Sequence, residues 1–190
     1  MKRVMLYFGS FNPIHKGHIA LAEYAVEKGL CDELVLVVSP QSPYKQAEEL
    51  APEMDRFEMA EAACAASRYP DRVCAMIEFN KALSKKIYAG ADMFLMPSKS
   101  EPCGLSQMIA SRYGTVAIVR EIGGLADTII PYNEFENTGN GFSFVNYNAH
   151  DMMHVIDYAL SLYRDHSKWA DLVKNVMNVD FSWDVSAKKY

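Results

Sequence analysis

The chain has 190 residues, of which 50% are hydrophobic, and its formal net charge at pH 7 is −5. This length and apolar content suit one compact domain with a substantial core. The negative charge, together with the absence of a basic cluster from the sequence, argues against a nucleic-acid or membrane-surface partner.

The four cysteines have no paired spacing in the sequence. The sequence therefore predicts neither a zinc site nor a disulfide framework, and it favours a reducing, cytoplasmic environment. The N-terminus does not have the length of a signal peptide, and no apolar run is long enough to cross a membrane. We expect no metal held by side chains and no membrane partner.

Apolar runs alternate with helix-compatible stretches along the chain. Strands are expected at residues 3–8, 33–39, 73–79, 93–97, 116–120 and 142–145. Helices are expected at residues 16–28, 52–67, 81–89, 105–113, 149–165 and 168–177. Gly29 and Gly114 suit helix ends, and Asn148 and Ser167 are placed as N-caps. With right-handed crossovers, this alternation predicts an α/β protein: a Rossmann-like, doubly wound parallel sheet with strand order 3-2-1-4-5-6.

The first expected strand runs directly into Gly9-Ser10-Phe11-Asn12-Pro13-Ile14-His15-Lys16-Gly17-His18. A strand, a tight loop and a helix start form a cradle in which backbone N–H groups and the helix dipole can hold an anion. His15 and His18 are three residues apart, so on one helical turn they point the same way and can donate to one phosphate group.

This run resembles the His-x-Gly-His signature of the nucleotidyltransferase superfamily, in the form typical of nicotinate-mononucleotide adenylyltransferases. The resemblance implies that His15 and His18 are catalytic and stabilise the transferring phosphate, and that Gly9, Ser10, Phe11 and Lys45 bind the nucleotide. It also implies that Mg²⁺ arrives on the nucleotide phosphates, with no tightly bound cofactor. The resemblance ends near residues 79–80, because the Ser-Tyr-Thr-x-x-Thr-Leu and Ile-Ser-Ser-Thr-x-Ile-Arg segments expected next are not in the sequence.

The remaining sequence is similar to another family, in residues 87–98, 101–108, 112–115 and 123–128. These segments resemble the C-terminal, donor-binding domain of bacterial and plant-type glycogen or starch synthases, which have the GT-B fold. The resemblance implies a sugar-nucleotide site formed by Glu101, Cys103, Gly104, Leu105, Gly123 and Gly124. Three positions depart from that family's usual residues, namely Lys99, Ser100 and Ile122.

The sequence therefore indicates a chimera, with residues 1–80 like an adenylyltransferase and residues 81–190 like a glycogen synthase, together forming one compact domain. We expect a composite crevice at the switch point of the sheet that binds an adenine nucleotide: ATP, ADP or ADP-glucose. Whether the chain is an enzyme stays open at this point.

Three functions remain. The first is adenylyl transfer from ATP to nicotinate mononucleotide, with impaired activity. The alternative is a non-catalytic chimeric or designed fold with relic motifs. The third is ADP-glucose-dependent glucosyl transfer, ranked last because the residues that neutralise the donor diphosphate in the synthases are not among those that match.

Overall fold

The computed structural model describes residues 3–38, 51–76 and 81–188. Its strands are β1 (Val4–Gly9), β2 (Glu33–Val38), β3 (Val73–Met76), β4 (Met93–Met96), β5 (Val116–Arg120) and β6 (Gly141–Phe144). They follow the order β3-β2-β1-β4-β5-β6. This order confirms the predicted α/β class and topology.

The helices are α1 (Lys16–Glu27), α2 (Glu53–Ala65), α3 (Lys81–Gly90), α4 (Ser106–Arg112), α5 (Gly124–Thr128), α6 (Ala149–Arg164), α7 (His166–Asn178) and α8 (Trp183–Ala187). Six of them match the predicted helices, whereas α5 and α8 were not predicted. Both are five residues long, which is too short to show a helical hydrophobic period.

The helix ends agree with the predicted caps at all but one position. Gly29 and Gly114 have positive φ angles of 66° and 85°, and Asn148 accepts a hydrogen bond from the backbone N–H of Asp151 at 2.9 Å. The prediction for Ser167 is wrong. Asp165 caps α7 instead, because its carboxylate accepts from the backbone N–H groups of Ser167 and Lys168, and a negative charge is favourable at a helix N-terminus.

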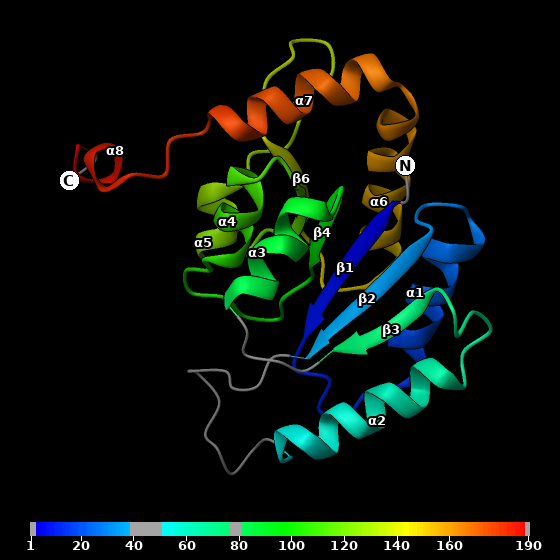
Figure 1. Cartoon of the computed structure of the whole chain (residues 1–190). Helices are drawn as coiled ribbons and strands as arrows, with labels where there is room; N and C mark the ends of the chain where they lie inside the picture. Colours follow the sequence, from blue (N-terminus) through cyan, green and yellow to red (C-terminus); the bar gives the residue numbers. More distant parts are fainter. Residues whose placement is uncertain (1–2, 39–50, 77–80, 189–190) are drawn as a thin grey trace. The chain divides into compact units, whose positions relative to one another are not determined.

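Contacts between Cα atoms divide the chain into two compact units, Met1–Ile87 and Tyr88–Tyr190, which are described one at a time. In the first unit, β1 pairs with β2 and β2 with β3, all in parallel. Both α1 and α2 contact these strands, and α2 runs beside β3 (Figure 1). Leu6, Leu34 and Leu36 are almost fully buried, as expected for strands covered by helices.

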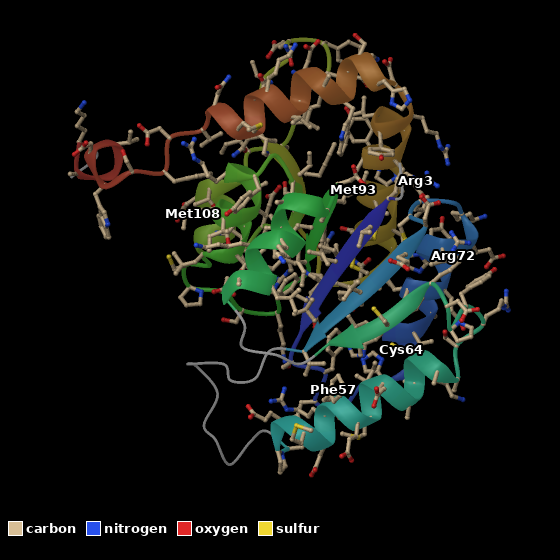
Figure 2. All side chains as sticks on the ribbon, in the orientation of Figure 1. Arg3, Phe57, Cys64, Arg72, Met93 and Met108 are labelled. Atoms are coloured by element: carbon tan, nitrogen blue, oxygen red, sulfur yellow. The ribbon has the colours of Figure 1, made fainter. Side chains whose placement is uncertain are left out.

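Two arginines tie the amino ends of these three strands together, at positions labelled in Figure 2. Arg3 precedes β1, and its guanidinium lies 2.9 Å from the Asp32 carboxylate. Arg72 precedes β3 and donates to the carbonyl oxygens of Cys31 and Asp32, at 2.7 and 2.8 Å. Hydrogen bonds from Arg3 hold the pKa of Asp32 well below its usual range. The cluster of Arg3, Asp32 and Arg72 thus lies at the edge of the sheet opposite the loop that follows β1.

In the second unit, β4 pairs with β5 and β5 with β6, also in parallel. Phe94 and Ile118 form the centre of its core, and α6 and α7 bury Ile156 and Leu172. The terminal helix α8 lies away from the other helices of this unit (Figure 1). Among the described residues, no helix is both long and apolar enough to cross a membrane.

Candidate functional site

In the first unit, the chain turns sharply between β1 and α1, and this turn brings the two predicted histidines together. His15 is the N-cap of α1, with extended backbone angles. The imidazole rings of His15 and His18 stack, with their centroids 3.7 Å apart and an interplanar angle of 28°. The three-residue spacing therefore places both rings on one side of the helix start, as predicted.

Backbone hydrogen bonds orient both rings. Nδ1 of His15 accepts from the N–H of Gly17 at 3.1 Å, and Nδ1 of His18 accepts from the N–H of His15 at 3.1 Å. A neutral imidazole that accepts at Nδ1 carries its proton on Nε2. The pair can therefore present two Nε2–H donors to an anion.

His18 is the more enclosed of the two. Its burial, and then the charge of His15, lower the pKa of His18 to about 4. The ring is therefore neutral at pH 7. It contacts Phe11 edge-on, with centroids 5.1 Å apart, and Phe11 is 2% exposed.

Phe11 and Gly9 shape the turn below the histidines. Phe11 has a positive φ of 42°, a conformation that non-glycine residues adopt rarely. A Cβ atom at Gly9 would lie 3.1 Å from the Phe11 ring, so the turn packs the ring directly against the strand backbone. Of the predicted nucleotide-binding residues, Gly9, Ser10 and Phe11 thus lie in this turn, whereas Lys45 lies outside the described residues.

A buried arginine that sequence reasoning missed supports this turn. Arg56 on α2 is 1% exposed, and it donates to the carbonyl oxygens of Ser10 at 2.7 Å and of Ala51 at 2.9 Å. Arg56 shares the buried face of α2 with Ala60 and Cys64. This i, i+4, i+8 spacing, with an arginine in an apolar stripe, is the signal that could have identified it.

In the second unit, the predicted sugar-nucleotide residues lie in two neighbouring segments. The first is the Glu101 loop, residues 101–105, which follows β4 and ends at the N-cap of α4. The second is the turn at Gly123 and Gly124, which leads into α5. The N–H of Gly124 donates to the carbonyl oxygen of Pro102 at 3.2 Å, so the backbones of the two segments are in contact.

This contact requires glycine. A Cβ atom at Gly123 would overlap the carbonyl oxygen of Glu101, and one at Gly124 would overlap that of Cys103. Gly123 also has a positive φ of 50°. The two glycines therefore allow a close approach that no other residue permits.

Arg120, at the end of β5, joins the loops that follow β4 and β6. Its guanidinium donates to the carbonyl oxygens of Lys99 at 2.8 Å and of Val145 at 3.3 Å, and more weakly to Ser98 at 3.4 Å. It also lies over the ring of Tyr147, 5.2 Å from the centroid. The loops after β4 and β6 are thus fixed to β5 by one side chain.

Within the described ranges, no group of three or more His, Cys, Asp or Glu side chains could hold a metal ion. The donor set of the histidine pair consists of N–H groups, which bind phosphate oxygens rather than a cation.

Comparison with known proteins gives two kinds of similarity. The family model described as cytidylyltransferase-like matches residues 6–176. Glycogen synthase from Clostridium botulinum (strain Alaska E43 / Type E3) is 57% identical over 123 residues, which are 65% of this chain and 26% of that protein. Glycogen synthase from Clostridium beijerinckii is 56% identical over 124 residues, again 65% of this chain and 26% of that protein.

The chain thus spans about a quarter of the length of these curated relatives. A 123-residue match is longer than the segment 81–190, so the similarity to glycogen synthase includes residues before Lys81. The position of the boundary between the two predicted parts stays a prediction.

Two solved structures resemble the whole fold. The catalytic domain of starch synthase IV from Arabidopsis thaliana, bound to ADP and acarbose, has a TM-score of 0.74 and 31% identity, covering 100% of this chain and 37% of that one. Sucrose-phosphate synthase from Thermosynechococcus elongatus has a TM-score of 0.63 and 22% identity, covering 99% of this chain and 43% of that one. The second likeness concerns the fold alone.

Proposed function

Because the chain belongs to the cytidylyltransferase-like family, we propose that it binds a nucleoside triphosphate at His15 and His18 and transfers the nucleotidyl group. The observation that carries the proposal is the orientation of the two rings, whose Nδ1 atoms both accept backbone hydrogen bonds. Nε2 of each ring is then left to donate a hydrogen bond to the substrate. The specific reaction implied by residues 9–18 is adenylyl transfer from ATP to nicotinate mononucleotide.

In this reaction an oxygen of the acceptor phosphate forms a bond to the α-phosphorus of ATP. The bond from that phosphorus to the α–β bridging oxygen breaks, and pyrophosphate leaves. Negative charge grows on the phosphorus oxygens in the transition state, where fixed N–H donors stabilise it most. Mg²⁺ bound to the phosphates would neutralise charge on the leaving group.

The neutral state of His18 suits this role. A ring with a pKa of about 4 keeps one donor and one acceptor across the physiological pH range. The acceptor, Nδ1, is used by the His15 backbone, so the donor at Nε2 is the atom available for substrate. In the proposed reaction His18 therefore acts as a neutral hydrogen-bond donor.

The test compares the parent chain with His18→Asn. The asparagine Oδ1 can replace Nδ1 as acceptor for the His15 backbone, whereas the distal donor is lost. We expect ATP to bind the parent with a Kd on the order of 0.1 to 1 mM, and to bind the variant about tenfold more weakly in calorimetry. His154→Asn, at an exposed position of α6, is the matched control.

Activity is measured as pyrophosphate release from Mg²⁺-ATP and nicotinate mononucleotide. Release that disappears in His18→Asn and persists in His154→Asn supports nucleotidyl transfer. ATP binding without release would favour the non-catalytic alternative, in which the motif is a relic. Equal ATP affinity in all three proteins would contradict the proposed site.

A second function is favoured by the 57% identity to a glycogen synthase. We propose that the Glu101 loop and the turn at Gly123 and Gly124 bind a nucleoside-diphosphate sugar, with ADP-glucose as the first choice. The close backbone approach at these glycines fixes how the two segments lie against each other. The sequence alone ranks ADP-glucose-dependent transfer last of the three functions. The identity to glycogen synthase supports sugar-nucleotide binding more strongly than that ranking.

Calorimetry with ADP-glucose, ADP and UDP-glucose tests this second function. Binding of ADP-glucose that weakens in Glu101→Gln and not in Glu136→Gln, an exposed glutamate of the same unit, would support it. Incorporation of glucose into glycogen is measured with the same proteins. Failure of all three nucleotides to bind would refute sugar-nucleotide binding.

A further inference from the structure

Gln107 is a polar side chain in the interior of the second unit. It lies on α4 and is 0% exposed, on the helix face that also buries Ala110 and Ser111. Burying an amide is unfavourable unless its polar atoms form hydrogen bonds. The position of Gln107 is therefore determined by the groups that its amide meets.

The amide nitrogen of Gln107 meets three acceptors. Nε2 lies 3.2 Å from the carbonyl oxygen of Cys103, 2.9 Å from that of Gly104 and 3.1 Å from Oγ1 of Thr128. The Thr128 hydroxyl in turn donates to the carbonyl oxygen of Gly124 at 2.6 Å. One amide thus connects the Glu101 loop to both ends of α5.

The carbonyl side of the same amide shows how closely it packs. Oε1 of Gln107 is buried without a hydrogen-bond partner among the described residues. A Cβ atom at Gly104 would lie 2.5 Å from this oxygen, and Gly104 has a positive φ of 73°. The side chain is therefore held through its donor nitrogen, and the loop backbone closes directly over it.

We propose that Gln107 is a positioning residue for sugar-nucleotide binding: it holds the Glu101 loop against the turn at Gly123 and Gly124. The proposal rests on the second function proposed above. Without the amide donors, the Cys103 and Gly104 carbonyl oxygens would lose their anchor, and the loop could move away from the turn. Displacements of about 1 Å in a binding constellation can cost about a hundredfold.

The main test uses Gln107→Met, which keeps the length of the side chain and removes the donors. We expect the Kd for ADP-glucose to rise about 10- to 100-fold. The matched control is Leu172→Ala. Leu172 is fully buried on α7, so its truncation destabilises the same unit without removing a bond to the loop.

Gln107→Glu supplies a readout that loss of stability would not produce. A protonated carboxyl group can donate one hydrogen bond, whereas the ionised form donates none. Burial raises the pKa of a carboxyl group, so the ratio of the variant's Kd to the parent's should fall as the pH is lowered from about 9.5 to 5.5. A ratio that does not change with pH would contradict a positioning role.

A second measurement does not depend on ligand. The N–H of Gly124, which donates to Pro102, should exchange with solvent at least about tenfold faster in Gln107→Met, and its exchange should change less in Leu172→Ala. If the parent does not bind ADP-glucose, the second function fails, and this exchange rate still decides whether Gln107 holds the loop. Unchanged exchange, or an equal loss of affinity in both variants, would overturn the proposal.

Discussion

Replacing His18 with asparagine should make the protein less sensitive to acid. His18 is partly enclosed between His15 and Phe11, and its pKa is lowered from 6.5 to about 4. In the unfolded chain the same ring is protonated as the pH falls below 6.5. The neutral ring therefore contributes to stability above pH 6.5, and this contribution is lost as the pH falls from 6.5 through 4.

The size of the effect follows from the shift in pKa. One pKa unit corresponds to about 1.36 kcal/mol, so the shift sets an upper bound of about 3.4 kcal/mol between neutral pH and pH 4. Solvent screening of the partly exposed ring reduces this value, and we expect about 1.5 to 3 kcal/mol. His18→Asn keeps an acceptor for the His15 backbone and cannot titrate.

The assay is denaturant unfolding of the parent, His18→Asn and His154→Asn at several pH values from 7.5 to 4. The variants share all their other titratable groups with the parent. Subtracting the parent's free energy of unfolding from a variant's at each pH therefore leaves the contribution of the substituted histidine. The stability of His18→Asn relative to the parent should rise as the pH falls, and that of His154→Asn should not follow this pattern. Parallel stability curves for the parent and His18→Asn would refute the reasoning.

Three further predictions have defined outcomes. Gly123→Ala introduces a Cβ that overlaps the Glu101 carbonyl, at a residue whose φ is positive. It should therefore destabilise the protein by more than about 2 kcal/mol, measured by thermal unfolding. Gly90→Ala is the control, because no atom lies within 4 Å of its new Cβ, and it should not destabilise the protein in this way. Arg56→Met removes the buried guanidinium and the hydrogen bonds that it donates to the Ser10 and Ala51 carbonyl oxygens. The free energy of unfolding, measured with denaturant, should fall by at least about 2 kcal/mol, and ATP should bind more weakly. The sequence-based expectation of one continuous core predicts a single calorimetric transition; two transitions, or two protease-resistant fragments, would contradict it.

The fold could be predicted because hydrophobic runs and helical stretches alternate along the chain. Buried parallel strands are almost continuously apolar, so β1, β2 and β5 stand out in the sequence. The short helix α5 could not be predicted, because its start depends on the contact between Gly123 and the Glu101 backbone. Contacts of this kind join segments that are distant in the sequence.

The candidate site was predicted only where the sequence has a local pattern. His15 and His18 form such a pattern, and the structure stacks them at the start of α1. Arg56 and Gln107 were missed, because a polar residue on a helix is usually solvent-exposed. Their burial depends on carbonyl groups that distant turns supply.

Among the described residues, the hydrogen bonds from Arg120 to its neighbouring loops all go to backbone carbonyl oxygens, at positions 98, 99 and 145. Every amino acid supplies that oxygen, so an exchange of side chain at these positions leaves the anchoring bonds in place. The loops after β4 and β6 can therefore accept a wide range of side chains while the hydrogen bonds from Arg120 hold their backbone in place. A library randomised at these three positions would vary the side chains of these two loops while Arg120 keeps the backbone path.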